Sequence, residues 1–102
     1  MSSLARHYLI SGRVQGVGFR NYTKKKATQM GVIGWVRNLE DGRVEALVCG
    51  DEPALTRLDR YISHGPELAV VESVERCDVD KSVIEVDTFT VEQTGEAPWQ
   101  QG

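Results

Sequence analysis

Residues 7–20, HYLISGRVQGVGFR, decide the fold, because within them the hydrophobic period changes from that of a strand to that of a helix. Apolar residues such as Tyr8 and Ile10 alternate with polar ones, which predicts a half-buried strand over residues 7–14. Glycines then interrupt the pattern, and helical spacing follows up to Gly31, a typical helix-ending residue. The buried face expected for this helix is Phe19, Tyr22, Ala27 and Met30.

A hairpin and a second helix are predicted next. Residues 33–38 (IGWVRN) have the character of a second strand, and the Asp-Gly pair within residues 39–42 predicts a tight turn into a third strand over residues 43–49. Asp51 is a typical helix cap, and a Gly-Pro pair at position 65 ends the helix. The second and third strands are therefore expected to be antiparallel neighbours.

The remaining sequence completes a sheet. A valine-rich strand is predicted over residues 69–79 and a short last strand over residues 89–91, while residues 81–87 fit neither pattern. The resulting order, βαββαβ with a final short strand, predicts the α+β class: a ferredoxin-like sandwich in which two helices cover one face of an antiparallel sheet. The right-handed crossover between the first two strands brings their carboxyl ends to one edge, so residues 16–20 and Asn38 are expected there together.

Length, charge and composition narrow the functional classes. The 102 residues permit one domain, 1–102, with its core over residues 6–92 and a C-terminal tail, residues 93–102, that carries no chemistry. Twelve Lys and Arg against fifteen Asp and Glu give a net charge of −3, so no overall field attracts nucleic acid or an acidic membrane. No signal peptide or membrane-spanning run is recognised, which predicts a cytoplasmic protein, and Cys49 and Cys77 are expected to be reduced.

The glycine-punctuated loop that leads into the first helix has the features of an anion site. Glycines allow several backbone N–H groups to point at one ligand, and the helix N-terminus adds partial positive charge. Arg20, in the first helical turn, is able to place its guanidinium on two oxygens of a bound anion. The loop does not match either common nucleotide-binding motif. A tight turn with a solvated arginine is the alternative explanation.

Residues 12–20 (GRVQGVGFR), together with residues 34–38 (GWVRN) and 41–45 (DGRVE), resemble the acylphosphatases. The resemblance extends from about Tyr8 to Val91. It implies a ferredoxin-like fold without metal or cofactor, and hydrolysis of an acyl phosphate to a carboxylate and inorganic phosphate. The resemblance further implies no other partner, and the chain is expected to be a monomer.

The resemblance also implies the roles of the site residues. Arg20 and Asn38 take the positions of the catalytic residues, with Arg20 neutralising the phosphoryl charge and Asn38 holding the attacking water. The loop supplies backbone N–H groups to the phosphoryl oxygens, and with Arg20 the expected phosphate-binding residues are Gln15, Gly16, Val17, Gly18 and Phe19. Gly18 departs from some relatives, which carry a bulky residue there.

Other chemistry-bearing residues are interpreted as structural. His7 and His64 are isolated and are expected at surface or helix-end positions, and the scattered carboxylates have no metal-site spacing. An RNA-binding sandwich is disfavoured, because residues 43–48 lack the aromatic side chains that stack bases. A non-catalytic anion-binding or regulatory module of the same fold stays open as an alternative, and an acyl phosphate hydrolysis assay distinguishes the two.

Overall fold

The computed structural model describes residues 3–100. The ends of the predicted domain and tail, residues 1–2 and 101–102, lie outside the described residues. The elements are β1 (Ser3–Arg13), α1 (Phe19–Gln29), β2 (Ile33–Asn38), β3 (Val44–Asp51), α2 (Glu52–His64), β4 (Val70–Val79), the 3₁₀ helix η1 (Lys81–Val83) and β5 (Phe89–Val91). Apart from η1, this is the predicted element order.

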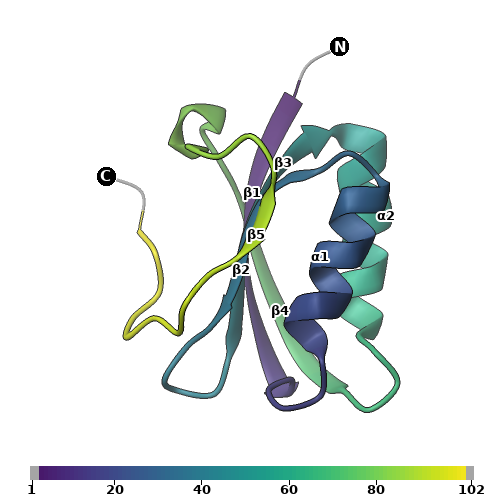
Figure 1. Cartoon of the computed structure of the whole chain (residues 1–102), viewed down its shortest axis with the longest axis vertical. Coiled ribbons are helices and arrows are strands. Elements are labelled where there is room, and N and C mark those ends of the chain that lie inside the picture. Colours follow the sequence, from purple (N-terminus) through teal and green to yellow (C-terminus); the bar gives the residue numbers. More distant parts are fainter. Residues whose placement is uncertain (1–2, 101–102) are drawn as a thin grey trace.

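The five strands form one sheet in the order β4-β1-β3-β2-β5, and both helices lie against the same face (Figure 1). The pairs β1–β3, β1–β4 and β2–β3 are antiparallel, which confirms the predicted hairpin between β2 and β3. The predicted ferredoxin-like sandwich is confirmed, and its sheet is antiparallel except at one edge, where β5 pairs with β2 in parallel. The chain after β4 crosses to the end of the sheet where β2 begins, so β5 starts there and runs in the same direction (Figure 1).

The main core lies between the helices and the sheet. α2 buries Leu55, Leu58 and Ile62 completely, and burial of each such side chain contributes roughly 1.5–3 kcal/mol. The N-terminus of α2 is capped as predicted, since the Ala54 N–H donates to Asp51 Oδ1 at 2.9 Å. α1 buries Phe19, Thr23 and Ala27, a strict four-residue spacing. Tyr22 and Met30, expected on the same face, are half-buried beside it.

The opposite face of β3 is also buried. All residues from Val44 to Cys49 are inaccessible or nearly so. The chain that follows β4 lies over this second face (Figure 1). The segment over residues 81–87, which fitted neither pattern, begins with the short η1, whose start is capped by Asp80 Oδ1 accepting from the Ser82 N–H at 2.8 Å. Trp99 of the tail packs on His7, with ring centroids 5.5 Å apart.

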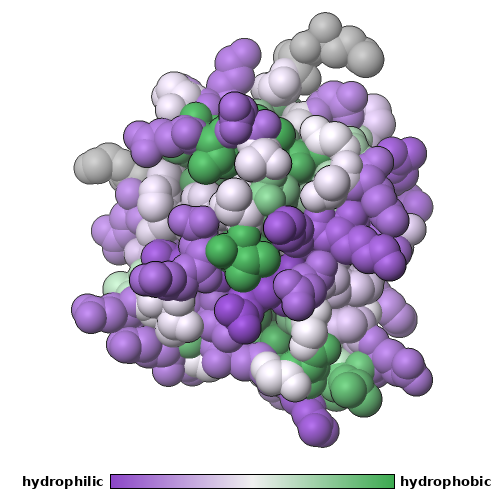
Figure 2. All heavy atoms as spheres, in the orientation of Figure 1, coloured by the Kyte–Doolittle hydropathy of each residue, from purple (hydrophilic) through white to green (hydrophobic). Residues whose placement is uncertain are grey.

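The outer surface is mostly polar. On the face shown in Figure 2, hydrophilic residues predominate and hydrophobic ones form small separate patches. Among the described residues, no helix is long and apolar enough to cross a membrane. Both cysteines are free thiols, with Cys49 buried and Cys77 exposed on β4. Most of the large apolar side chains are buried against one or the other face of the sheet.

Candidate active site

The loop between β1 and α1 ends in an open helix N-terminus. Gly16 and Gly18 have φ values of 74° and 80°, in the left-handed region that favours glycine. Gly18 occupies the cap position of α1 and leaves it without a side-chain cap. The first bond of the helix runs from the Tyr22 N–H to Gly18 O at 3.0 Å, so the preceding N–H groups have no partner inside the helix. The positive end of α1 is free to receive an anion.

Arg20 is the second residue of α1 and is half-buried. Within residues 3–100 it makes no ion pair, whereas Arg6, Arg37, Arg43 and Arg76 each have a carboxylate partner. An arginine that adjoins an uncapped helix N-terminus and has no internal counterion carries positive charge available to a ligand. This arrangement favours the anion-site interpretation over that of a simple turn.

Gln15 joins the loop to the hairpin between β2 and β3. Its side-chain amide donates from Nε2 to Leu39 O at 2.8 Å and to Arg43 O at 2.9 Å. The sequence predicted a role only for the backbone of Gln15. It gave no signal for the side chain, because both acceptors are carbonyls more than twenty residues away. The bonds bring the anion loop to the turn that directly follows Asn38.

Asn38 is the last residue of β2, paired with Val44 of β3. Its Oδ1 is the one buried side-chain polar atom without a hydrogen-bond partner in the described part of the chain. Burying an acceptor without a partner costs roughly 1–3 kcal/mol, so an exception of this kind requires an explanation. Asn38 Oδ1 is therefore available to accept a hydrogen bond from a group that the protein itself does not supply.

The hairpin turn beside Asn38 is held internally. The Gly42 N–H donates to Leu39 O at 3.1 Å, and the Leu39 N–H donates to Arg43 O at 2.8 Å. Asp41 accepts from the backbone N–H and the guanidinium of Arg43, and this bonding lowers the pKa of the Asp41 carboxyl. The Asp-Gly signal in the sequence thus produces a rigid turn at the edge of the site.

A buried ionic cluster lies on the other face of the sheet. Glu45 has no exposed side-chain surface, and it accepts from Arg37 Nε, His7 Nε2 and the Trp99 N–H, each at 2.7 Å. The expectation that His7 lies at the surface is wrong: its side chain is 13% exposed and faces Glu45. The partnership depends on strand register, which pairs Leu9 with Glu45 and so places His7 diagonally across from it.

The cluster keeps Glu45 ionised. Burial raises the pKa of the Glu45 carboxyl, but the hydrogen bonds from His7, Arg37 and Trp99 together hold the pKa below its ordinary value. A carboxyl whose pKa is lower in the folded state stabilises the fold above its unfolded-state pKa. That contribution is lost as the pH falls through the folded-state value.

We therefore expect Glu45→Gln to lower the free energy of unfolding at pH 7 by about 3 kcal/mol, because it removes the fully buried counterion of the partly exposed Arg37. The variant should also lose part of the acid dependence of stability below about pH 4.5, where the parent carboxyl becomes protonated. Denaturant unfolding between pH 3 and pH 7 measures both effects. Glu72→Gln, on the exposed surface of β4, is the matched control. Equal stability of the two variants would contradict the prediction.

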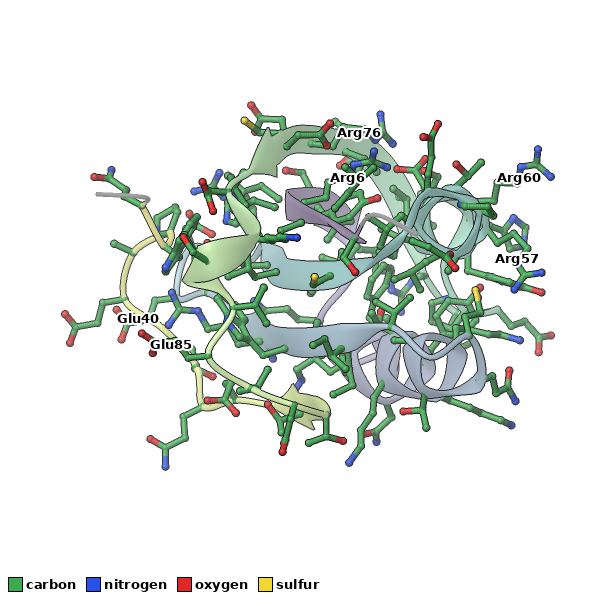
Figure 3. The ribbon with its side chains drawn as sticks, turned by 90° about the horizontal axis from the view of Figure 1, so that it is seen from above. Arg6, Glu40, Arg57, Arg60, Arg76 and Glu85 are labelled. Atoms are coloured by element: carbon green, nitrogen blue, oxygen red, sulfur yellow. The ribbon has the colours of Figure 1, made fainter. Side chains whose placement is uncertain are left out.

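Figure 3 shows where some of the exposed charges lie. Figure 3 places Arg57 and Arg60, on α2, at one side of the molecule, and Glu40 and Glu85 at the opposite side. Within the described residues, no group of three or more His, Cys, Asp or Glu is arranged to hold a metal ion. The positive charge beside the loop comes from the N-terminus of α1 and from Arg20.

These features define a class: a ferredoxin-like sandwich with a glycine-rich loop and an uncapped N-terminus at the start of its first helix. The sequence profile of the Acylphosphatase family matches residues 6–91. The chain is 49% identical to an acylphosphatase of Pseudomonas paraeruginosa over 75 residues, 74% of this chain and 82% of that protein. It is 41% identical to an acylphosphatase of Rhodopseudomonas palustris over 96 residues, 94% and 92% of the two chains.

Solved structures agree with this assignment. The crystal structure of acylphosphatase from Bacillus subtilis has a TM-score of 0.82 and 32% identity, covering 87% of this chain and 98% of that one. The chain belongs to the acylphosphatase family. It is an enzyme that hydrolyses acyl phosphates, with a small-molecule acyl phosphate as substrate and inorganic phosphate as product.

Proposed function

We propose that the enzyme works by in-line attack of a water held by Asn38 on a phosphoryl group held by Arg20 and the backbone N–H groups of residues 15–19. The observation that carries this proposal is the buried and unpartnered Oδ1 of Asn38. Accepting a hydrogen bond from water satisfies this atom and orients a lone pair of the water toward phosphorus. The Gln15 bonds to the hairpin support the placement of water and phosphoryl group side by side.

The chemistry needs few catalytic groups. The water oxygen forms a bond to phosphorus, the bond from phosphorus to the acyl oxygen breaks, and its electron pair leaves on the carboxylate. The conjugate acid of such a carboxylate has a pKa of about 4.3, so it departs at neutral pH without a general acid. The proton released by the water is taken by a phosphoryl oxygen.

Positioning and charge stabilisation are then the remaining tasks. Phosphoryl transfer has a loose transition state with charge spread over the equatorial oxygens. The backbone N–H groups at the N-terminus of α1 and the guanidinium of Arg20 stabilise that charge by hydrogen bonds. Asn38 orients the water for in-line attack. A monomeric state, a cytoplasmic location and independence of metal ions are also predictions for this chain.

A steady-state assay tests the proposal. We expect purified protein to hydrolyse acetyl phosphate and benzoyl phosphate in excess chelator, with competitive inhibition by inorganic phosphate, because the anion loop and Arg20 bind phosphate directly. Activity that is lost on chelation and restored by magnesium or zinc would contradict a metal-free mechanism. Phosphate binding without any turnover would instead support the non-catalytic anion-binding module.

A further inference from the structure

The tail is bonded to the backbone on both sides of Leu39, the residue that follows Asn38. The Gly95 N–H donates to Asn38 O at 2.9 Å, and the Glu40 N–H donates to Gly95 O at 3.0 Å. Gly95 also forms a parallel bridge with Leu39, which continues the parallel pairing of β5 with β2. β2 ends at Asn38, and the tail pairs with the backbone just beyond that end. It lies there on the same side as β5, the side opposite to β3.

The tail is anchored further along its length. Arg37 Nη2 donates to Ala97 O at 3.1 Å, and the Trp99 N–H donates to the buried Glu45. Arg37 reaches Glu45 with its Nε at the same time, so one guanidinium links the tail to β3. Trp99 covers His7 at the end of this path. Side chains of the buried cluster thus hold the tail against the sheet.

Gly95 lies directly against the guanidinium of Arg37. It is buried, and a Cβ built on it would lie 2.5 Å from Cζ of Arg37. Gly95 has no positive φ, so a side chain there acts through this collision and not through backbone strain. The guanidinium of Arg37 is the end of a long side chain, but its bonds to Glu45 and Ala97 hold it in place. A side chain on Gly95 therefore requires either these bonds to break or the tail to move away. Displacing the tail at this position removes the partners of the Asn38 carbonyl and the Glu40 N–H together.

Asn38 depends on this support. Its Oδ1 has no protein partner, so no hydrogen bond to that atom fixes the direction of the side chain. The backbone of residue 38 must then determine where the amide lies. Errors of about 1 Å in such a group cost on the order of 100-fold in rate.

We infer that the tail, through Gly95, is a positioning device for Asn38, and that it acts on the attacking water and not on phosphate binding. This inference rests on the proposed role of Asn38. The profile of the family ends at residue 91, so these contacts come from residues beyond the matched part. Gly95 and the tail touch no substrate in this scheme, and their effect on turnover passes through the backbone of Asn38.

The test compares Gly95→Val with Glu96→Val, a matched change at the exposed neighbouring position. We expect Gly95→Val to lower kcat on the order of ten-fold or more while the inhibition constant of phosphate stays within about three-fold. Glu96→Val should retain parental kcat. Trp99→Ala removes the ring that packs on His7 and does not collide with Arg37. We expect it to lower kcat as well, but by less than Gly95→Val.

A double-mutant cycle distinguishes positioning from general destabilisation. In an Asn38→Ala background, Gly95→Val should change kcat by less than about two-fold, because the group it positions is already absent. Additive losses, or unchanged kcat in both folded tail variants, would overturn the inference. If Asn38→Ala alone kept parental kcat, the proposed function would fail at that point, so the two failures are separable.

Discussion

Asn38→Ala is expected to reduce kcat by at least about 100-fold while the inhibition constant of inorganic phosphate stays within about three-fold of the parent. A neutral amide adds little to holding a doubly charged anion, but it fixes the water that becomes the nucleophile. Its contribution is therefore realised mainly in the transition state. Steady-state kinetics with acetyl phosphate and phosphate inhibition measure the two quantities separately.

The control for this variant addresses folding. Asn38 ends β2 and precedes the turn, so each protein requires a denaturant midpoint beside its kinetics. Gln29→Ala removes an exposed amide at the far end of α1 and should leave both kcat and phosphate inhibition unchanged. A folded Asn38→Ala enzyme with parental turnover would remove Asn38 from the mechanism. Loss of phosphate binding without loss of turnover at saturation would reassign it to substrate binding.

Arg20→Gln is expected to weaken phosphate binding and turnover together. The guanidinium meets negative charge in the bound substrate and in the transition state, so its removal affects both. Loss of a bidentate, charge-assisted contact costs about 3 kcal/mol or more, which is at least about 100-fold in kcat/KM. Arg20→Lys should recover part of the binding, because it keeps the charge but loses the planar fork.

Arg60→Gln provides the matched control for charge. Arg60 lies on the exposed surface of α2 and has no ion-pair partner within residues 3–100, as is true of Arg20. Its replacement changes the net charge equally, and we expect kcat/KM to stay within about two-fold of the parent at physiological salt, where exposed charges are screened. Equal losses from both variants would attribute the effect to overall charge and not to a site at Arg20.

Local patterns in the sequence predicted most of the helices and strands. The predicted bounds of β2, residues 33–38, agree with the structure, because the strand is bounded by Gly31 on one side and the Asp-Gly turn on the other. α2 begins after its predicted cap at Asp51 and ends at the Gly-Pro pair. These signals act over a few residues, which is why a single sequence contains them.

The loop and hairpin motifs also predicted the family, and the profile match confirms it. The expected meeting of the loop with the end of β2 followed from the handedness of the crossover. The structure adds how they are joined, through the Gln15 side chain and two hairpin carbonyls. The roles of Arg20 and Asn38 stay predictions until the variants are measured.

The sequence by itself determined the order of elements, the apolar faces of the helices and the glycine-rich anion loop, because each depends on residues close together in the chain. Only the tertiary structure decided the parallel edge at β5, the partnership of His7 with Glu45 and the bonds from Gly95 to the backbone around Asn38. Each of these depends on strand register or on contacts between segments that are far apart in the sequence. A shift of one residue in register reverses the face on which a side chain lies. A turn sets the register of the β2–β3 hairpin, but no turn joins β1 to β3.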